Sequence, residues 1–400
     1  MNYLGEIRAY WRYLAAATIG QGAGYSFTTY TNNVFTPELI RQFGWARSSV
    51  ALVGTAALLG IVCQPVAGRL TDAIGVRRMA LVGVIGAPLI YLALGAQTGA
   101  FAQFFLLNVL QVIIVGGTTS TTVYSRLIAE KFDRARGLAL GVVTCAPAAA
   151  GAVCVPLLVH FMATRGWRAG FVAVAVGIAI AGVSAILLIP GGAGTRPHRP
   201  AVSEHRSRSY RTIVRHPAFA FIILGMVLCN LSFSMQTTQL KVILTDQGVD
   251  TALSTWALSL FATSIIGGRL LCGLALDRLP AYVVAALGMG LPGIGLALLA
   301  HGVAGSAEVT LAVLLLGLSL GAEGDILAYL VMRYFRLEVY SAVVGLVLGA
   351  IALSMGAGSL LLSFMLKASG SYTSFLTVSA VAALAGGAMF LQLRRVRPAQ

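Results

Sequence analysis

Long apolar runs, separated by short polar breaks, recur along this 400-residue chain. A membrane helix needs about 20 mainly apolar residues to cross a hydrocarbon core of about 30 Å. Twelve runs meet this length, at 11–36, 48–70, 79–98, 101–126, 137–162, 168–189, 217–242, 253–276, 281–301, 306–331, 339–366 and 372–393. Only 10% of residues are charged, against about 25% in ordinary soluble domains. The sequence therefore predicts an all-α membrane protein with twelve transmembrane helices.

A central polar stretch divides these runs into six and six. Residues 190–216 are rich in Gly, Pro, Ser and Arg, which is typical of a flexible linker. We expect an N-terminal six-helix half over 1–190, a cytoplasmic linker over 191–216 and a C-terminal six-helix half over 217–400. The halves repeat, because Gly68-x-x-x-Asp72 returns 205 residues later as Gly273-x-x-x-Asp277. Paired repeats of this kind are how many transporters alternate a binding site between two membrane faces.

The net charge of +15 indicates orientation. With the N-terminus inside, 21 of the 28 Lys and Arg residues fall on cytoplasmic segments and 6 on outer segments. This distribution follows the positive-inside rule, with both termini cytoplasmic. We therefore expect a multi-pass protein of the cell membrane, in bacteria the inner membrane, and no nucleic-acid partner.

Four stretches of sequence resemble a known family. The run Gly68-Arg69-Leu70-Thr71-Asp72-Ala73-Ile74-Gly75-Val76-Arg77-Arg78 resembles the signature loop between helices two and three of the major facilitator superfamily. Residues 35–45, 132–141 and 166–168 are similar to the monocarboxylate-transporter-like branch at the end of helix one, the start of helix five and the turn before helix six. The resemblance implies two six-helix pseudo-repeats and transport by alternating access.

Three charged residues lie well inside predicted spans: Arg269, Glu323 and Asp325. A charge inside the membrane is costly, so it should be paired or line water. Arg269 is a candidate for binding a substrate carboxylate through its two-pronged guanidinium, and the alternative is a structural ion pair with Asp325 or Glu323. Asp325 and Glu323 are candidates for proton coupling, and the alternative is a hydrogen-bonded acid that holds helices together. Two positions apart on a helix, the acids cannot face one cavity equally.

Polar residues gather in helices one, four, seven and ten, which line the cavity in the superfamily that this chain resembles. Tyr25, Thr28, Thr29 and Asn32 form one stripe at helical spacing in the first span. With Asn230 and Gln236 of the seventh span they are predicted to bind substrate, and interhelical hydrogen bonding is the alternative. Asp72, Arg77, Arg78 and Asp277 are predicted to act as a gate at the cytoplasmic face, since an acid can cap a helix N-terminus and pair with basic residues.

The common nucleotide-binding and zinc-hydrolase motifs are missing from the sequence. It holds no Walker loop and no HExxH, and its five cysteines show no CxxC spacing. We therefore expect no enzyme, no catalytic residues, no metal site and no cofactor. The predicted function is secondary active transport of a small organic anion, a carboxylate, by a proton symporter that works as a monomer among membrane lipids. The alternative is a proton-driven exporter of amphipathic drugs or cations.

Overall fold

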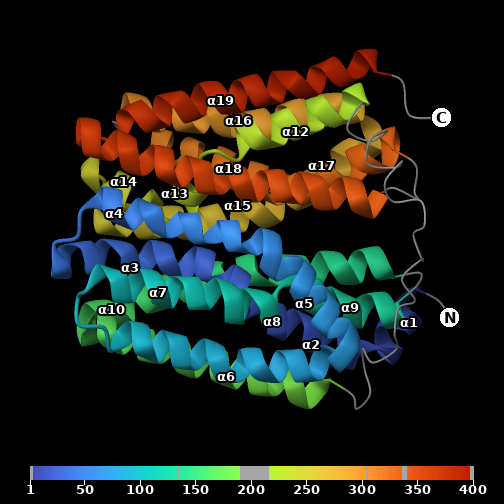
Figure 1. Cartoon of the computed structure of the whole chain (residues 1–400), viewed down its shortest axis with the longest axis horizontal. Coiled ribbons are helices and arrows are strands. Elements are labelled where there is room, and N and C mark those ends of the chain that lie inside the picture. Colours follow the sequence, from blue (N-terminus) through green and yellow to red (C-terminus); the bar gives the residue numbers. More distant parts are fainter. Residues whose placement is uncertain (1–2, 133–134, 190–215, 303–304, 336–339, 397–400) are drawn as a thin grey trace. The chain divides into compact units, whose positions relative to one another are not determined.

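A computed structural model describes residues 3–132, 135–189, 216–302, 305–335 and 340–396, and the regular structure in these ranges is helical (Figure 1). This confirms the predicted all-α class. Nine of the described helices are long and apolar enough to cross a membrane, and the predicted count of twelve stays a prediction. Except for His216, the predicted linker 191–216 lies outside the described residues.

Two compact units make up the chain. The first contains residues 1–45 and 59–200, and the second contains residues 46–58 and 201–400. The short segment 46–58 therefore belongs to the second unit by its contacts, although it comes from the N-terminal part of the sequence.

The first unit surrounds a core of buried side chains that includes Met79, Tyr124 and Phe132. Its elements are α1 (Tyr3–Ala9), α2 (Trp11–Gly22), η1 (Tyr25–Phe27), α3 (Thr28–Phe43), α5 (Gly60–Ile74), α6 (Val76–Gly95), α7 (Phe101–Leu110), η3 (Gln111–Gly116), α8 (Gly117–Thr119), α9 (Thr121–Lys131) and α10 (Arg136–Leu188).

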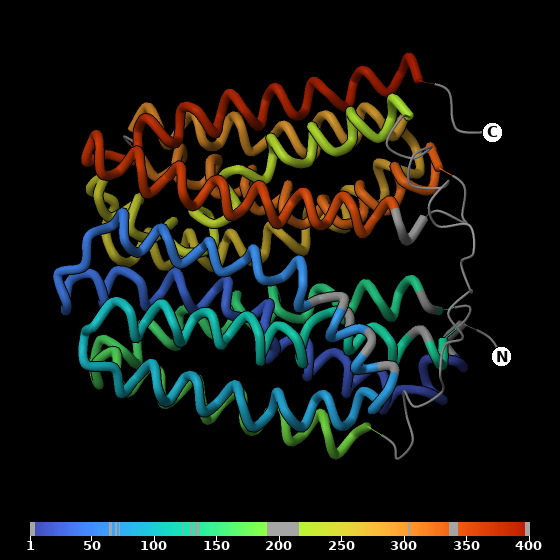
Figure 2. The backbone as a smooth tube through the Cα atoms, in the orientation of Figure 1, coloured from blue at the N-terminus to red at the C-terminus, as the bar shows by residue number. Residues whose placement is uncertain are grey.

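The second unit has a separate core that includes Met226, Leu330 and Phe390. Its elements are α4 (Arg47–Ala51), most of η2 (Leu52–Leu59), α12 (Pro217–Cys229), α13 (Phe233–Thr238), α14 (Leu240–Asp246), α15 (Thr251–Arg278), α16 (Ala281–His301), α17 (Ser306–Tyr334), α18 (Tyr340–Ser369), α19 (Thr373–Leu391) and η5 (Gln392–Arg395). Within this unit α16 and α19 run side by side along most of their length (Figure 2).

The predicted spans 137–162 and 168–189 are joined by a tight turn inside α10. Gly166 has φ of 81° and ψ of 164°, and this conformation reverses the chain direction between two helical stretches. A side chain at this position would be strained, because positive φ is readily adopted only by glycine. The sequence prediction of a tight turn at this place is confirmed.

Two helices of the first unit are interrupted where they meet. The first predicted span breaks at Gly24 between α2 and η1, and the fourth contains a π-helical turn, η3, and a kink at Ser120. The hydroxyl of Thr119 accepts a hydrogen bond of 3.0 Å from the backbone N–H of Tyr25. Irregular backbone at membrane depth persists only where protein or water satisfies it. Here a threonine of the fourth span accepts the hydrogen bond of a backbone N–H at the break in the first span.

Glycines bring α15 and α17 into close contact in the second unit. A Cβ at Gly268 would collide with the backbone of Leu318, and one at Gly321 would collide with the backbone of Ile265. Small residues at such crossings let helix backbones approach closely, which improves the van der Waals packing between helices in lipid. The crossing lies directly beside the charged residues that the sequence singles out.

We expect Gly321→Ala to lower the thermal stability of the purified protein, because its methyl group would force α15 and α17 apart. Overpacking of this kind costs about 1–3 kcal/mol. The matched control is Gly273→Ala in α15, where a Cβ meets nothing within 4 Å. Thermal unfolding in detergent measures both variants. An unchanged melting temperature for Gly321→Ala would contradict the close crossing.

Candidate functional site

Arg269 and Asp325 lie opposite one another where α15 crosses α17. The Nε atom of Arg269 is 3.8 Å from Oδ2 of Asp325. This is an ion pair at a separation longer than the roughly 2.7–3.2 Å of an N–H···O hydrogen bond. Both residues stand nine positions before the ends of their helices, which places them about 14 Å inside. The sequence predicts that Arg269 could pair with either acid, and the structure shows the pair with Asp325.

The glycine crossing creates room for the guanidinium group. A Cβ at Gly324 would lie 3.9 Å from Nη2 of Arg269, so the arginine side chain passes over this glycine. One turn further along α15, the Sγ of Cys272 donates a weak hydrogen bond of 3.8 Å to the carbonyl of Ala322. The guanidinium group thus lies beside Gly324, the residue between the two acids of α17.

Glu323 points to a different neighbour, Asn230. The side-chain amide of Asn230 donates a hydrogen bond of 3.0 Å to Oε1 of Glu323. The same nitrogen lies 3.0 Å from the carbonyl of Met226. Asn230 directly follows the end of α12, in the turn that leads to α13. The predicted divergence of the two acids is confirmed, because Asp325 faces α15 and Glu323 faces the break in the seventh span.

The break in the seventh span has polar side chains beyond Asn230. Gln236, in α13, donates a hydrogen bond of 2.8 Å from Nε2 to Oγ of Ser232. Both of these side chains are buried. Of the predicted substrate-binding set, the structure thus places Arg269, Asn230 and Gln236 in the second unit, and it brings Arg269 and Asn230 to the two acids of α17.

The remaining predicted binding residues belong to the first unit and follow its helix break. Tyr25 lies against Gly116 of the π-helical turn. Thr28 is buried, while Thr29 and Asn32 are half-buried. The backbone carbonyl groups of these three residues each accept a hydrogen bond from a side chain three or four positions later in the same helix. Their role in substrate binding stays a prediction.

The predicted cytoplasmic gate is described only in part. Arg77 and Arg78 are exposed at the start of α6, and Asp277 is exposed near the end of α15. The side chain of Asp72 lies outside the described residues. The gating assignment therefore stays a prediction.

A second ion pair, which the sequence did not predict, connects segment 46–58 to α14 within the second unit. Arg47 of α4 pairs with Asp246 at the end of α14, and its guanidinium carbon lies 6.0 Å from the ring centre of Tyr372. Burial raises the pKa of Asp246, and Arg47 partly offsets this effect. The partners are 199 positions apart, and no motif in the sequence links them. The helix α4 also packs along α18.

The described part of the chain has no cluster of metal-binding side chains. No cluster of three or more His, Cys, Asp or Glu residues occurs in it. The five cysteines are all free thiols. The site thus offers a guanidinium, two carboxyl groups and an amide, a set suited to binding an organic anion and to exchanging a proton.

The sequence matches the family model of the Major Facilitator Superfamily over residues 17–359. The chain therefore belongs to this superfamily and is a multi-pass membrane transporter, not an enzyme. No curated protein sequence matches it.

Three solved structures with the same fold illustrate the likeness, and each is a transporter that is 14% identical to this chain. A POT family transporter in complex with a thioalcohol-conjugated peptide aligns with a TM-score of 0.76 over 97% of this chain and 96% of its own. Peptide transporter POT in complex with sulfate gives 0.77, over 96% and 94%. A bacterial homologue of the human lysosomal transporter Spinster, inward-facing and unoccupied, gives 0.70, over 96% and 97%. At this identity the likeness establishes the fold alone.

We expect the charges of Arg269 and Asp325 to be energetically coupled. Arg269→Gln leaves the carboxylate of Asp325 without this cation, and Asp325→Asn leaves the arginine without this anion. The double variant should be more stable than the sum of the single losses predicts, with a coupling of about 0.5–3 kcal/mol. Thermal unfolding of the four proteins in detergent gives the cycle. Strictly additive losses would show that the pair makes no contribution to stability.

Proposed function

We propose that this transporter moves a small organic anion with a carboxylate group, coupled to protons, as a symporter of the monocarboxylate-transporter-like branch. The observation that carries the proposal is the position of Arg269, inside a membrane helix and 3.8 Å from Asp325. An arginine keeps its charge at any physiological pH, so an anion must accompany it through the transport cycle. Asp325 serves in the empty state, and the substrate carboxylate competes with Asp325 in the loaded state.

The guanidinium group is suited to this competition. It presents several N–H donors in a planar fork that matches a carboxylate with two parallel hydrogen bonds. The distance of 3.8 Å from Nε of Arg269 to Oδ2 of Asp325 is longer than a direct hydrogen bond. Asp325 therefore does not form a close hydrogen bond with this nitrogen. A substrate carboxylate that binds bidentately would therefore replace a weak ion pair by a strong one.

Glu323 is the proposed proton carrier, and Asn230 is its partner. Carboxyl groups inside membrane proteins commonly form proton relays. The amide of Asn230 donates to Oε1 of Glu323, and an amide can also accept a hydrogen bond from a protonated carboxyl after its side chain turns over. This contact joins α17 to the break in the seventh span, where discontinuous helices place substrate and ion sites in transporters. Protonation of Glu323 would thus change the hydrogen bond with Asn230 at the break in the seventh span.

Other features complete the proposal. Tyr25, Thr28, Thr29 and Asn32 contribute polar groups to substrate binding from the first span, and Gln236 contributes from the seventh. Asp72, Arg77, Arg78 and Asp277 gate the cytoplasmic side. The protein works as a monomer in the cell membrane with both termini in the cytoplasm, as its charge distribution indicates.

We expect Arg269→Lys to bind a carboxylate substrate much more weakly than the wild type while it still folds. Lysine keeps the charge but loses the bidentate fork, which is worth about 1.5–3 kcal/mol in hydrogen bonds to a charged group. Thermal-shift screening against a panel of carboxylates identifies a ligand, and calorimetry then compares affinities. Arg278→Lys, at the exposed end of the same helix, is the control. Equal affinities in the wild type and Arg269→Lys would remove Arg269 from the binding site.

We expect Glu323→Gln to abolish uptake driven by a pH gradient while substrate exchange across the membrane continues. The amide cannot carry a proton, but it preserves the size of the side chain and its contact with Asn230. Proteoliposomes with and without an imposed gradient measure the two activities. Asp325→Asn tests the second acid in the same way, and Glu308→Gln, exposed in the first turn of α17, is the control. Full gradient-driven accumulation in both Glu323→Gln and Asp325→Asn would rule out coupling through these acids.

A further inference from the structure

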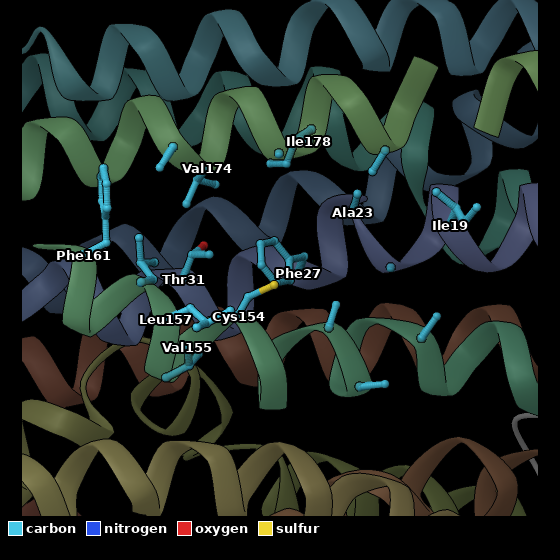
Figure 3. A pocket seen from close by; sticks show the side chains of 18 of the residues that line it. Ile19, Ala23, Phe27, Thr31, Cys154, Val155, Leu157, Phe161, Val174 and Ile178 are labelled. Atoms are coloured by element: carbon cyan, nitrogen blue, oxygen red, sulfur yellow. The ribbon is translucent and has the colours of Figure 1, made fainter. Parts of the chain in front are cut away.

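A long apolar groove runs along the first unit between three helical segments (Figure 3). Its volume is about 910 Å³, within the range of pockets that hold small molecules. One wall carries Ile19, Ala23 and Phe27 of the first span, and the other walls belong to the two halves of α10. The groove spans positions 18–31 of the first wall, which corresponds to about 20 Å of helix.

Small residues create this groove. Gly22, Ala23, Gly177 and several alanines line it, so the three helices leave space between them. A Cβ built at Gly177 meets nothing within 4 Å, which shows that this part of the groove is open. The hydroxyl of Thr31, one of its few polar groups, is engaged 2.9 Å from the hydroxyl of Tyr91. The floor of the groove is therefore suited to a hydrocarbon chain.

The groove opens on a surface that faces lipid. Val153 and Leu157 of α10 are 64% and 66% exposed beside it, and Ile180 on the other half of α10 is 63% exposed. Large apolar side chains exposed in such numbers on a multi-pass membrane protein face the bilayer. An acyl chain can therefore enter the groove sideways from the membrane.

One end of the groove is basic. His160, Thr164 and Arg165 line it there, directly before the turn at Gly166. All three are exposed, and none of the described residues that line the groove is acidic. A basic side chain at the membrane interface attracts an anionic lipid head group. The groove thus combines an apolar trough with a cationic end, as a phospholipid requires.

We propose that this groove is a binding site for an anionic phospholipid of the bilayer. An acyl chain lies along the small residues, and the phosphate contacts Arg165, with His160 and Thr164 beside it. By the charge distribution, the turn at Gly166 lies on the outer side, so the lipid comes from the outer leaflet. The acyl chain packs against Gly22, Ala23 and Phe27, which flank the break in the first span. It thereby stabilises the first unit around that break.

The test titrates delipidated wild-type protein with phosphatidylglycerol and, separately, with phosphatidylcholine of the same chain length. Native mass spectrometry counts bound lipid, and thermal unfolding records stabilisation. Phosphatidylglycerol should bind preferentially and raise the melting temperature. Arg165→Gln should weaken its binding about fivefold, since each basic residue contributes about that factor near an anionic surface. Arg41→Gln, an exposed arginine outside the groove, is the charge control and should bind as the wild type does.

A second variant fills the groove. Gly177→Leu should abolish binding of both lipids, while Gly141→Leu, in the other half of α10 where a Cβ is also unobstructed, should retain it. Equal binding of the two lipids, full phosphatidylglycerol binding by Arg165→Gln, or stabilisation by free palmitate alone would each overturn the proposal. None of these readouts depends on transport, so they are independent of the proposed substrate.

Discussion

A guanidinium that cannot lose its proton, placed inside a membrane helix, is the constraint on which the rest of the second unit depends. Arg269 is tolerated because α17 brings Asp325 to within 3.8 Å of it. That approach requires Gly268 and Gly321 at the helix crossing, since side chains there would collide with backbone. The same close crossing turns Glu323 toward Asn230 and the break in the seventh span. One packing feature thus sets the geometry of both acids.

Much of this arrangement could be predicted from the sequence. Apolar runs of membrane-spanning length gave the helical class, because few other structures satisfy backbone groups in lipid. The depth of Arg269, Glu323 and Asp325 followed from counting residues to the helix ends, and their spacing of two predicted that the acids diverge. The signature loop from Gly68 to Arg78 gave the superfamily, which the family match confirms.

Other features could not be predicted, for physical reasons. Beside the breaks at Gly24 and Asn230, Tyr25 and Asn230 donate hydrogen bonds to other helices, and no local sequence pattern encodes these contacts. The ion pair of Arg47 with Asp246 joins positions that are 199 apart. By its contacts segment 46–58 belongs to the second unit, although the hydropathy pattern predicts residues 48–70 as one span. The apolar groove arises from small residues on three helices, and each of these alone is ordinary in a membrane helix.

The central claim is that a carboxylate substrate takes the place of Asp325 at Arg269 while a proton joins the site. Calorimetry of substrate binding at pH 7, repeated in buffers with different heats of ionisation, measures the number of protons taken up with each ligand. The account predicts uptake of a proton on binding by the wild type and its loss in Glu323→Gln. Carboxylate binding without proton uptake in the wild type would contradict it.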